Sequence, residues 1–282
     1  MRKVLVITIN YKNSQVTRAL IQSLETCENS DGLHLIVVNN ESNTNGRREL
    51  NSLKNSSSLS IQLLHLEKNL YYWGGAAFAL ESLKLDFTVS PDWIIICNND
   101  ILIEQKDFFT RLLAMDIEQY PIIAPGIISS KTQKNLNPFL INPISKMQDL
   151  YYRLYYWNKY TAKTVHFMGR RIKKLRQWLS TGIKPEDELK IYAPHGSFII
   201  FSRHYFLQGG FLDTGFTFFG EEISVAEIAR RLDLPVYYVP GLKIIHNEHM
   251  SLSKPAWEVV FNHSKKSYEY LKQKYRSSNG GN

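Results

Sequence analysis

The sequence is short of the features that mark several large classes of protein. Among its 282 residues it has only two cysteines, Cys27 and Cys97, and each lies in an apolar or periodic stretch. We therefore expect buried thiols of a reducing compartment rather than a disulfide framework or a metal cluster. No segment approaches the roughly 18 apolar residues that would span a bilayer, and the first apolar run is too short for a secretory signal. These absences predict a cytoplasmic protein.

Two familiar phosphate-binding motifs are also missing. The chain has neither the G-x-G-x-x-G dinucleotide fingerprint nor the G-x-x-x-x-G-K-[ST] P-loop, so both cofactor classes are disfavoured. What it has instead is Gly74-Gly75, at the start of a predicted helix. Two adjacent glycines indicate either a tight loop or a place where backbone amides approach a phosphate or sugar.

Composition and charge allow a large folded domain with an acidic partner. Hydrophobic residues make up 44% of the chain and aromatic residues 12%, which is ample for one core. The formal net charge of +8 suits a nucleotide, a phospholipid surface or a nucleic acid. Because no nucleic-acid readout motif accompanies the charge, no nucleic-acid partner is expected.

Strand and helix patterns alternate in the first half of the chain. Buried-strand runs at residues 3–9, 34–38 and 61–66 are separated by an amphipathic helix after Ser14, its expected N-cap, and by a polar helix near residues 47–54. Such alternation predicts parallel strands with right-handed crossovers. The expected fold class is therefore α/β, with a doubly wound, mostly parallel sheet.

A fourth strand at residues 93–97 stops at Asn98-Asn99-Asp100, and the rest of the chain is organised around it. Ligands of open parallel sheets bind beyond the carboxyl ends of the strands, so Asp100 is placed at the rim of a site, where a carboxylate can hold a hard cation. The competing interpretation is turn chemistry, since Asn and Asp close loops readily.

The second half is less regular. We expect a helix at residues 107–116, a broken strand at 122–128, a strand at 195–201, a strand pair at 236–239 and 242–245 around Pro240-Gly241, and a docking helix in the tail. Glu221 and Glu222 open a helix over 223–232, where carboxylates also suit the helix dipole. Residues 135–190 lose periodicity and are predicted to form an insertion of a single domain, dividing residues 1–130 from 191–250 and a C-terminal helix and tail at 251–282.

Several fragments, in this order, resemble one family. They are Ile9-Asn-Tyr-Lys12, Val37-Val-Asn-Asn-Glu-Ser42, Asn69 with Gly74-Gly75, Asn98-Asn-Asp100, His195-Gly-Ser197, Gly210-Phe-Leu-Asp213, Gly220-Glu-Glu222 and Val239-Pro240 with His246. Each is weak alone, but their joint order resembles the inverting family 2 glycosyltransferases of GT-A-type fold, especially a branch of bacterial rhamnosyltransferase-like enzymes that build polysaccharides.

The resemblance implies a set of site residues. Glu222 matches the position of the catalytic base, with Glu221 beside it, and Asp100 and His246 match positions that face a divalent cation, Mg²⁺ or Mn²⁺. His195, Gly196 and Asp213 fall on the acceptor side. The nucleotide-sugar pocket is implied at Ile9, Asn10, Tyr11, Asn39, Asn40, Ser42, Asn69, Gly74, Gly75, Asn98, Asn99 and Asp100.

Three positions depart from the family's pattern. Asn39 stands where an Asp usually faces the base, and Asn98 replaces the first Asp of the D-x-D pattern. Both changes remove negative charge but keep hydrogen-bonding capacity. Glu222 is one methylene longer than the usual Asp, which shifts the carboxylate on a scale that matters for catalysis.

The sequence thus predicts a metal-dependent inverting glycosyltransferase that transfers a sugar from a dTDP- or UDP-linked donor to a glycan or lipid-linked glycan in polysaccharide synthesis. Two alternatives stay open: a nucleotidyltransferase of related fold, and a non-catalytic carbohydrate- or nucleotide-binding relative. Donor sugar, acceptor, linkage and oligomeric state are not predicted.

One segment has no acidic residue at all. Residues 150–185 contain nine Lys and Arg, more than the net charge of the whole chain, interleaved with Tyr, Trp and Phe. Aromatic rings beside basic side chains suit a bilayer headgroup region, whereas such charge runs are also common on solvated helix faces. We expect this segment to contact the anionic inner face of the cell membrane.

Overall fold

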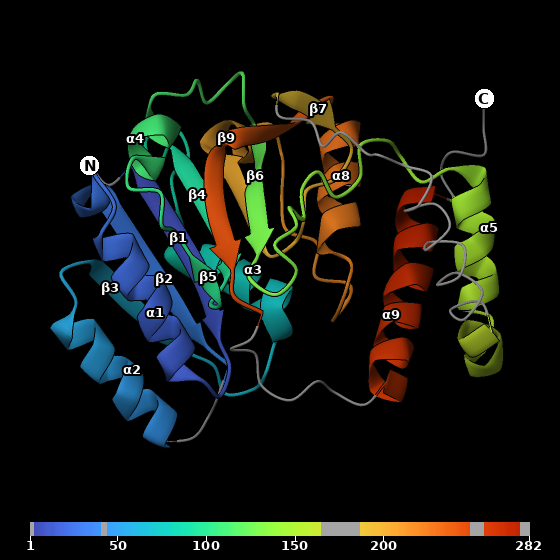
Figure 1. Cartoon of the computed structure of the whole chain (residues 1–282), viewed down its shortest axis with the longest axis horizontal. Coiled ribbons are helices and arrows are strands. Elements are labelled where there is room, and N and C mark those ends of the chain that lie inside the picture. The colour runs from blue at the N-terminus through green and yellow to red at the C-terminus, as the bar shows by residue number, and fades with distance from the viewer. Residues whose placement is uncertain (1–2, 41–43, 165–186, 249–256, 277–282) are drawn as a thin grey trace.

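The computed structural model describes residues 3–40, 44–164, 187–248 and 257–276. Figure 1 shows a central sheet flanked by helices, with two helices beside one another at one end. The strands are β1 (Val4–Asn10), β2 (Leu33–Asn39), β3 (Ser60–His65), β4 (Trp93–Asn98), β5 (Ile101–Leu102), β6 (Ile122–Ser129), β7 (Leu189–Ile191), β8 (Phe198–Ser202) and β9 (Val236–His246). The α-helices are α1 (Ser14–Glu25), α2 (Thr44–Ser56), α3 (Tyr71–Leu83), α4 (Phe108–Leu113), α5 (Lys146–Tyr155), α7 (Arg203–Leu207), α8 (Glu221–Arg231) and α9 (Trp257–Leu271).

The described strands form one mixed sheet of order β3-β2-β1-β4-β8-β6-β9-β5, with β7 added on β9. Strands β1 to β4 are parallel to one another, as the alternating pattern predicted. Strand β8 then runs antiparallel to β4 on one side and to β6 on the other, and β6 pairs in parallel with β9. The carboxyl ends of β1, β2 and β4 therefore meet at one edge, where the polar residues after each strand gather.

Each face of the sheet has its own hydrophobic core, because the parallel strands are apolar on both sides. Helices α1, α2 and α4 cover one face through side chains such as Leu20, Leu50 and Phe108. Helices α3 and α8 cover the other face through Trp73 and Val225. The doubly wound α/β architecture is therefore confirmed.

Residues 236–245 differ from the expected strand pair. They form a single strand, β9, that follows β6 along its whole length and shifts register between Pro125 and Gly126 of β6. The Pro240-Gly241 step is thus a bulge inside one strand and not a turn between two. The prediction failed because Pro and Gly mark both kinds of irregularity.

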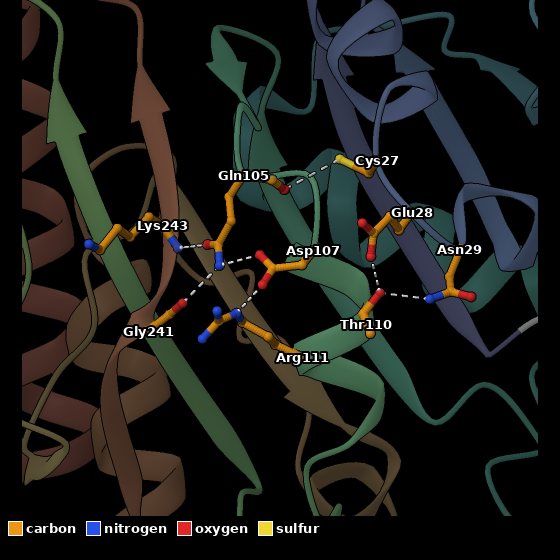
Figure 2. Close-up of polar contacts among 9 residues, drawn as sticks. All are labelled: Cys27, Glu28, Asn29, Gln105, Asp107, Thr110, Arg111, Gly241 and Lys243. Atoms are coloured by element: carbon orange, nitrogen blue, oxygen red, sulfur yellow. Dashed lines mark hydrogen bonds and ion pairs between the residues drawn. The ribbon is translucent and has the colours of Figure 1, made fainter.

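The side chain of Gln105 holds this bulge in place (Figure 2). Its Nε2 donates to the Gly241 carbonyl at 3.1 Å and to Asp107 Oδ1 at 2.8 Å, and its Oε1 accepts from the Lys243 amide at 2.8 Å. Gln105 follows β5, which pairs with the end of β9. The loop after β5 therefore helps to fix the register of the strand that ends at His246.

Several helix boundaries also differ from the sequence prediction. Helix α1 is capped by the Asn13 side chain, which accepts from the Val16 amide, and Ser14 is its first residue rather than its cap. Helix α3 begins at Tyr71, three residues before the Gly74-Gly75 pair that was expected to open it. Both shifts are small. The shift of α1 follows from a side-chain cap that periodicity does not reveal, whereas Leu70, the N-cap of α3, makes no such bond.

The predicted insertion contains helix α5, which packs on the tail helix α9 at the right of Figure 1. The rings of Tyr156 and Tyr268 stack with centroids 5.0 Å apart, and Tyr268 Oη donates to Asp149 at 3.2 Å. Residues 165–186, which include most of the basic segment, lie outside the described residues. Within the part of the chain that is described, no helix is long and apolar enough to cross a membrane.

Buried Asp213 anchors the C-terminal segment to the domain. Its carboxylate accepts hydrogen bonds from Tyr270 Oη (2.7 Å) and Tyr275 Oη (2.6 Å) and from the Gly215 amide (3.1 Å), and it pairs with Lys274 Nζ at 3.1 Å. Burial by itself raises the pKa of Asp213, but these hydrogen bonds outweigh burial, so the pKa lies below its usual value. The ionised carboxylate thus holds α9 and the π-helical turn η2 (Lys272–Arg276) on the sheet.

We expect Asp213→Asn to lower the free energy of unfolding by about 1–3 kcal/mol, because it leaves buried donors poorly paired. A carboxyl group whose pKa is lower in the folded state stabilises the fold fully at pH values above its unfolded-state pKa. This stabilisation disappears as the pH falls through the folded-state pKa. The difference in free energy of unfolding between Asp213→Asn and wild type should therefore become smaller at acid pH. Urea unfolding at several pH values measures it, with exposed Asp31→Asn as the matched control; equal destabilisation by both would contradict the anchor.

Candidate functional site

A cavity of about 470 Å³ lies at the edge of the sheet where β4 ends. Its walls come from the end of β4, the loop before β8, the start of α8 and the facing sides of α5 and α9. The lining includes Asn98, His195, Gly196, Ser197, Glu221, Glu222, His246, Tyr152, Tyr156 and Tyr268. Titratable groups from distant parts of the sequence thus face one cavity.

Asp100 and His246 meet at one side of this cavity. Ile101 of β5 lies opposite His246 in the antiparallel pairing with β9, and the Asn247 amide donates to the Asp100 carbonyl at 2.7 Å. This pairing brings His246 Nε2 to 3.1 Å from Asp100 Oδ1, with both side chains largely buried. Two residues 146 positions apart are therefore held together by backbone hydrogen bonds.

Both side chains are of a type that binds divalent cations. The 3.1 Å between His246 Nε2 and Asp100 Oδ1 is the distance of a hydrogen-bonded ion pair, and the same two atoms could instead bind one cation. Glu248 Oε1 lies 4.0 Å from His246 Nδ1, the other ring nitrogen. Among the described residues no three His, Cys, Asp or Glu side chains gather as a complete cage. A bound ion would take its remaining ligands from a substrate and from water.

The loop His195-Gly196-Ser197 connects this pair with the carboxylates of α8. The buried Asn137 side chain accepts from the His195 amide at 2.9 Å, and the Ser197 carbonyl accepts from the Asn98 amide at 2.9 Å. Burial, and next to it the nearby His246, lower the pKa of His195 to about 4. The Ser197 amide donates to His195 Nδ1, so the neutral ring carries its proton on Nε2.

Glu221 and Glu222 are brought against the backbone of Gly196. The Gly196 amide donates to Glu222 Oε1 at 3.3 Å, and the Gly220 amide donates to Glu221 at 3.0 Å. A methyl group at Gly196 would lie 2.6 to 2.8 Å from atoms of both glutamates, which explains the glycine. Burial raises the pKa of both carboxyl groups, and the charge of Glu221 raises the pKa of Glu222 further. A carboxyl group of this kind exchanges a proton near neutral pH.

Two neighbours of the predicted site residues, Tyr72 and Asn137, were not predicted from the sequence. Tyr72 Oη donates to the Gly196 carbonyl at 2.9 Å. Burial first, and then Cys97, Glu221, Glu222 and Asp100, raise the pKa of Tyr72. Asn137 precedes a proline and had no distinguishing pattern. Tyr72 lies two residues before the glycine pair, so that motif was the only signal pointing to it.

The predicted nucleotide pocket is built on a network of buried amides. Asn10 Nδ2 donates to Asn39 Oδ1 at 3.1 Å, and Asn10 Oδ1 accepts from Thr17 Oγ1 at 2.9 Å, which in turn accepts from Asn99 Nδ2 at 3.0 Å. Asn39 Nδ2 also lies 3.3 Å from His65 Nδ1. The amide at position 39 can donate to an unprotonated Nδ1 of that ring, whereas a carboxylate could only accept from a protonated one.

Asn40 holds the start of α3 in the same way. Its amide donates to the Tyr71 carbonyl at 2.8 Å and accepts from the Leu70 amide at 3.3 Å, while Asn69 Oδ1 accepts from the Tyr71 amide at 2.7 Å. A methyl group at Gly75 would lie 3.2 Å from Ile9 Cγ1, so this glycine lets the helix approach the ends of β1 and β2. Gly74 lies in the same turn.

Tyr11, Ser42 and Asp213 are the predicted site residues that remain. Tyr11 is exposed beyond β1, and Ser42 lies outside the described residues. Asp213 does not reach the acceptor side of the cavity; its carboxylate is engaged by the C-terminal segment. A larger cavity of about 840 Å³ lies near Arg111 and Lys243, but its polar side chains bond mainly to one another.

Neither protein-family models nor curated protein sequences match this chain. Several solved structures, however, are similar to it. The mannosyltransferase PcManGT from Pyrobaculum calidifontis, in complex with GDP-Man and Mn²⁺, is 12% identical with a TM-score of 0.54, over 96% of this chain and 64% of that one. GalNAc-T7 with UDP, GalNAc and Mn²⁺ is 10% identical with a TM-score of 0.59, over 96% and 47%. TarS of S. aureus is 10% identical with a TM-score of 0.54, over 99% and 74%.

At these identities the likeness concerns the fold alone. The chain has the GT-A-like α/β fold that these glycosyltransferases share, so the predicted fold class is confirmed. The chain spans about two thirds and about half of the first two structures. The family 2 branch stays a prediction.

We expect Gly196→Ala to displace the two glutamates and to lower the free energy of unfolding by about 1–3 kcal/mol through overpacking. Because the pKa values of Glu221 and Glu222 are raised in the folded state, the stability of wild type falls as the pH rises from the unfolded-state pKa towards the folded-state pKa. The displaced glutamates of the variant should be better hydrated and their pKa values less raised, so its stability should fall less over this pH range. Thermal unfolding between pH 4 and pH 9 tests this, with Gly32→Ala as the control because a methyl group there meets nothing within 4 Å. Identical pH profiles for wild type and Gly196→Ala would contradict the geometry.

Proposed function

We propose that this protein is a divalent-metal-dependent inverting glycosyltransferase, which moves a sugar from a nucleoside diphosphate donor to a glycan or lipid-linked glycan acceptor. The observation that carries the proposal is the continuous series of contacts across one cavity: Glu222 to Gly196, His195 beside His246, and His246 to Asp100. A general base and a cation-binding pair therefore share one space on a glycosyltransferase-like fold.

The donor would lie along the carboxyl ends of β1, β2 and β4. There the amides of Asn10, Asn39 and Asn99 form a rigid floor, and Asn98 lines the cavity. Asp100 and His246 would hold the cation, which neutralises the charge that develops on the departing diphosphate. A dTDP or UDP donor is the expectation from the family resemblance, while GDP is the nucleotide of one structure with the same fold.

The acceptor would enter from the side of α5 and α9. Tyr152, Tyr156 and Tyr268 form the wall there, and tyrosine combines an apolar ring with a polar hydroxyl, which suits the mixed surface of a sugar. An acceptor hydroxyl beside Glu222 gives its proton to the carboxylate as its oxygen attacks the anomeric carbon. The bond from that carbon to the diphosphate breaks, and the nucleoside diphosphate leaves.

The raised pKa of Glu222 sets a direction for the pH dependence. A base must be ionised to act, so turnover should rise with pH along a limb placed above the ordinary glutamate value. The negative charge of Glu221 contributes to the raised pKa of Glu222 and therefore to the pH at which this limb lies. Glu221 is therefore a positioning residue in this proposal.

We expect Asp100→Asn to weaken nucleoside diphosphate binding more than tenfold in the presence of Mn²⁺ and to change it little in its absence, because a neutral carboxamide binds a hard cation more weakly than a charged carboxylate. Calorimetry with UDP, dTDP and GDP measures this on protein whose fold is checked by circular dichroism. Exposed Glu104→Gln, on the same sheet edge, is the control. Unchanged metal-dependent affinity would leave Asp100 with the role of a turn residue.

Glu222→Gln should lower sugar transfer by about 10²–10⁴-fold while donor affinity is kept, since that is the usual contribution of a general base. Glu221→Gln should move the acidic limb of the rate profile to lower pH, because it removes a neighbouring negative charge. Released nucleoside diphosphate, assayed across pH with and without Mn²⁺, reports both. Donor binding without any release, in wild type as well, would identify a non-catalytic binding protein.

A further inference from the structure

Helix α5 exposes an apolar stripe to solvent. Met147, Leu150, Tyr151 and Leu154 follow the i, i+3, i+4, i+7 spacing of one helix face and are 83%, 54%, 40% and 42% exposed. Trp157, just beyond the helix, is 69% exposed. A helix of a globular domain normally turns such a stripe to the core, and none of the ten residues of α5 is buried.

The opposite side of α5 makes the closest contact with the domain, and of the stripe residues Leu150 alone lines another cavity, which α5 forms with Tyr192 and Glu227. Tyr152 and Tyr156 pack on Tyr268 of α9 and line the cavity. Asp149 is also turned that way, since it accepts from Tyr268 Oη. The helix therefore has two different faces, and only one of them packs on α9 and lines the cavity.

Basic side chains border the exposed face. Lys146 and Arg153 lie within α5 at one margin of the stripe, and Lys159 and Lys163 follow it. Lys159 pairs with exposed Glu258 at 3.5 Å, and Lys163 lies over the Trp257 ring at 5.5 Å, while Lys146 and Arg153 are exposed. The only acidic residue of α5 is Asp149, on the other face. Positive charge beside an apolar and aromatic stripe matches the headgroup region of an anionic bilayer.

We propose that the outer face of α5 docks the protein on anionic phospholipid membranes. Ten residues of α-helix extend about 15 Å, which is too short to span a bilayer but sufficient to lie in its surface. Docking in this way places the tyrosine-lined side of the cavity about one helix diameter, about 10 Å, from the headgroups. Combined with the proposed function, on which this last step rests, the acceptor class is a glycan carried on a membrane lipid.

The test is co-sedimentation of the full chain with vesicles of phosphatidylcholine alone and of equal parts phosphatidylcholine and phosphatidylglycerol, at low and at high salt. Wild type should pellet only with the anionic vesicles, and less at high salt. A triple substitution, Met147→Gln with Leu150→Gln and Leu154→Gln, should reduce binding at least tenfold. Lys146→Gln with Arg153→Gln should also reduce it, by about tenfold at low salt.

The matched control changes three exposed apolar residues elsewhere, Phe78→Gln, Val89→Gln and Leu207→Gln, and should bind like wild type. Circular dichroism and thermal unfolding confirm that each variant is folded. Failure of wild type to bind anionic vesicles, or equal binding by the stripe variant, would overturn the proposal. So would a wild-type dimer that the stripe variant converts to a monomer, since α5 would then be an interface between two copies.

An assay of sugar transfer to a water-soluble acceptor tests the proposed transferase activity independently of membrane docking. The stripe variant should keep that activity, because none of its three changed side chains lines the cavity. Vesicle binding by a wild-type protein without transferase activity would support the docking face and refute the lipid-linked acceptor.

Discussion

The hydrogen bonding of β8 to β4 on one side and to β6 on the other joins the two halves of the sheet. Without this antiparallel strand the parallel block β3-β2-β1-β4 would end at an open edge, and β6 and β9 would have no fixed position beside it. The loop that enters β8 carries His195, Gly196 and Ser197. That loop contacts Glu222 through the Gly196 amide and lies beside His246 through His195, so the site depends on a strand pairing that lies beneath it.

The polar groups at this edge divide into two kinds. Asn10, Asn39 and Asn40 are buried and satisfied by one another or by backbone, which makes the edge rigid before any ligand arrives. Glu221 and Glu222 instead share a poorly solvated corner in which burial opposes their ionisation. Rigidity on one side and an easily protonated pair on the other is the arrangement expected where a charged ligand is held and a proton is moved.

Much of the fold could be predicted from local pattern, because buried parallel strands and amphipathic helices have distinct periods. The parallel block from β1 to β4 followed the predicted runs closely. The bulge in β9 could not be distinguished from a turn, and the short strand β7 gave no signal. Asp100 was found from its place after a strand, whereas its contact with His246 arises from the pairing of β5 with β9 and was available only through family resemblance. Asp213 belonged to a matching fragment, yet its partners Tyr270, Lys274 and Tyr275 lie in the tail, and sequence order does not reveal such contacts.

The dependence of the tyrosine wall on α9 has a consequence for biosynthesis. Helix α5 packs against α9, and α9 is fastened to the domain by Asp213 through residues near 270–275. A nascent chain that has emerged as far as the end of β9 already contains every described strand, Asp100, His246 and both glutamates. Its tyrosine wall, however, still lacks Tyr268 and the helix on which Tyr152 and Tyr156 pack. The Asp100–His246 pair and both glutamates are therefore synthesised before the helix that completes the wall of the cavity.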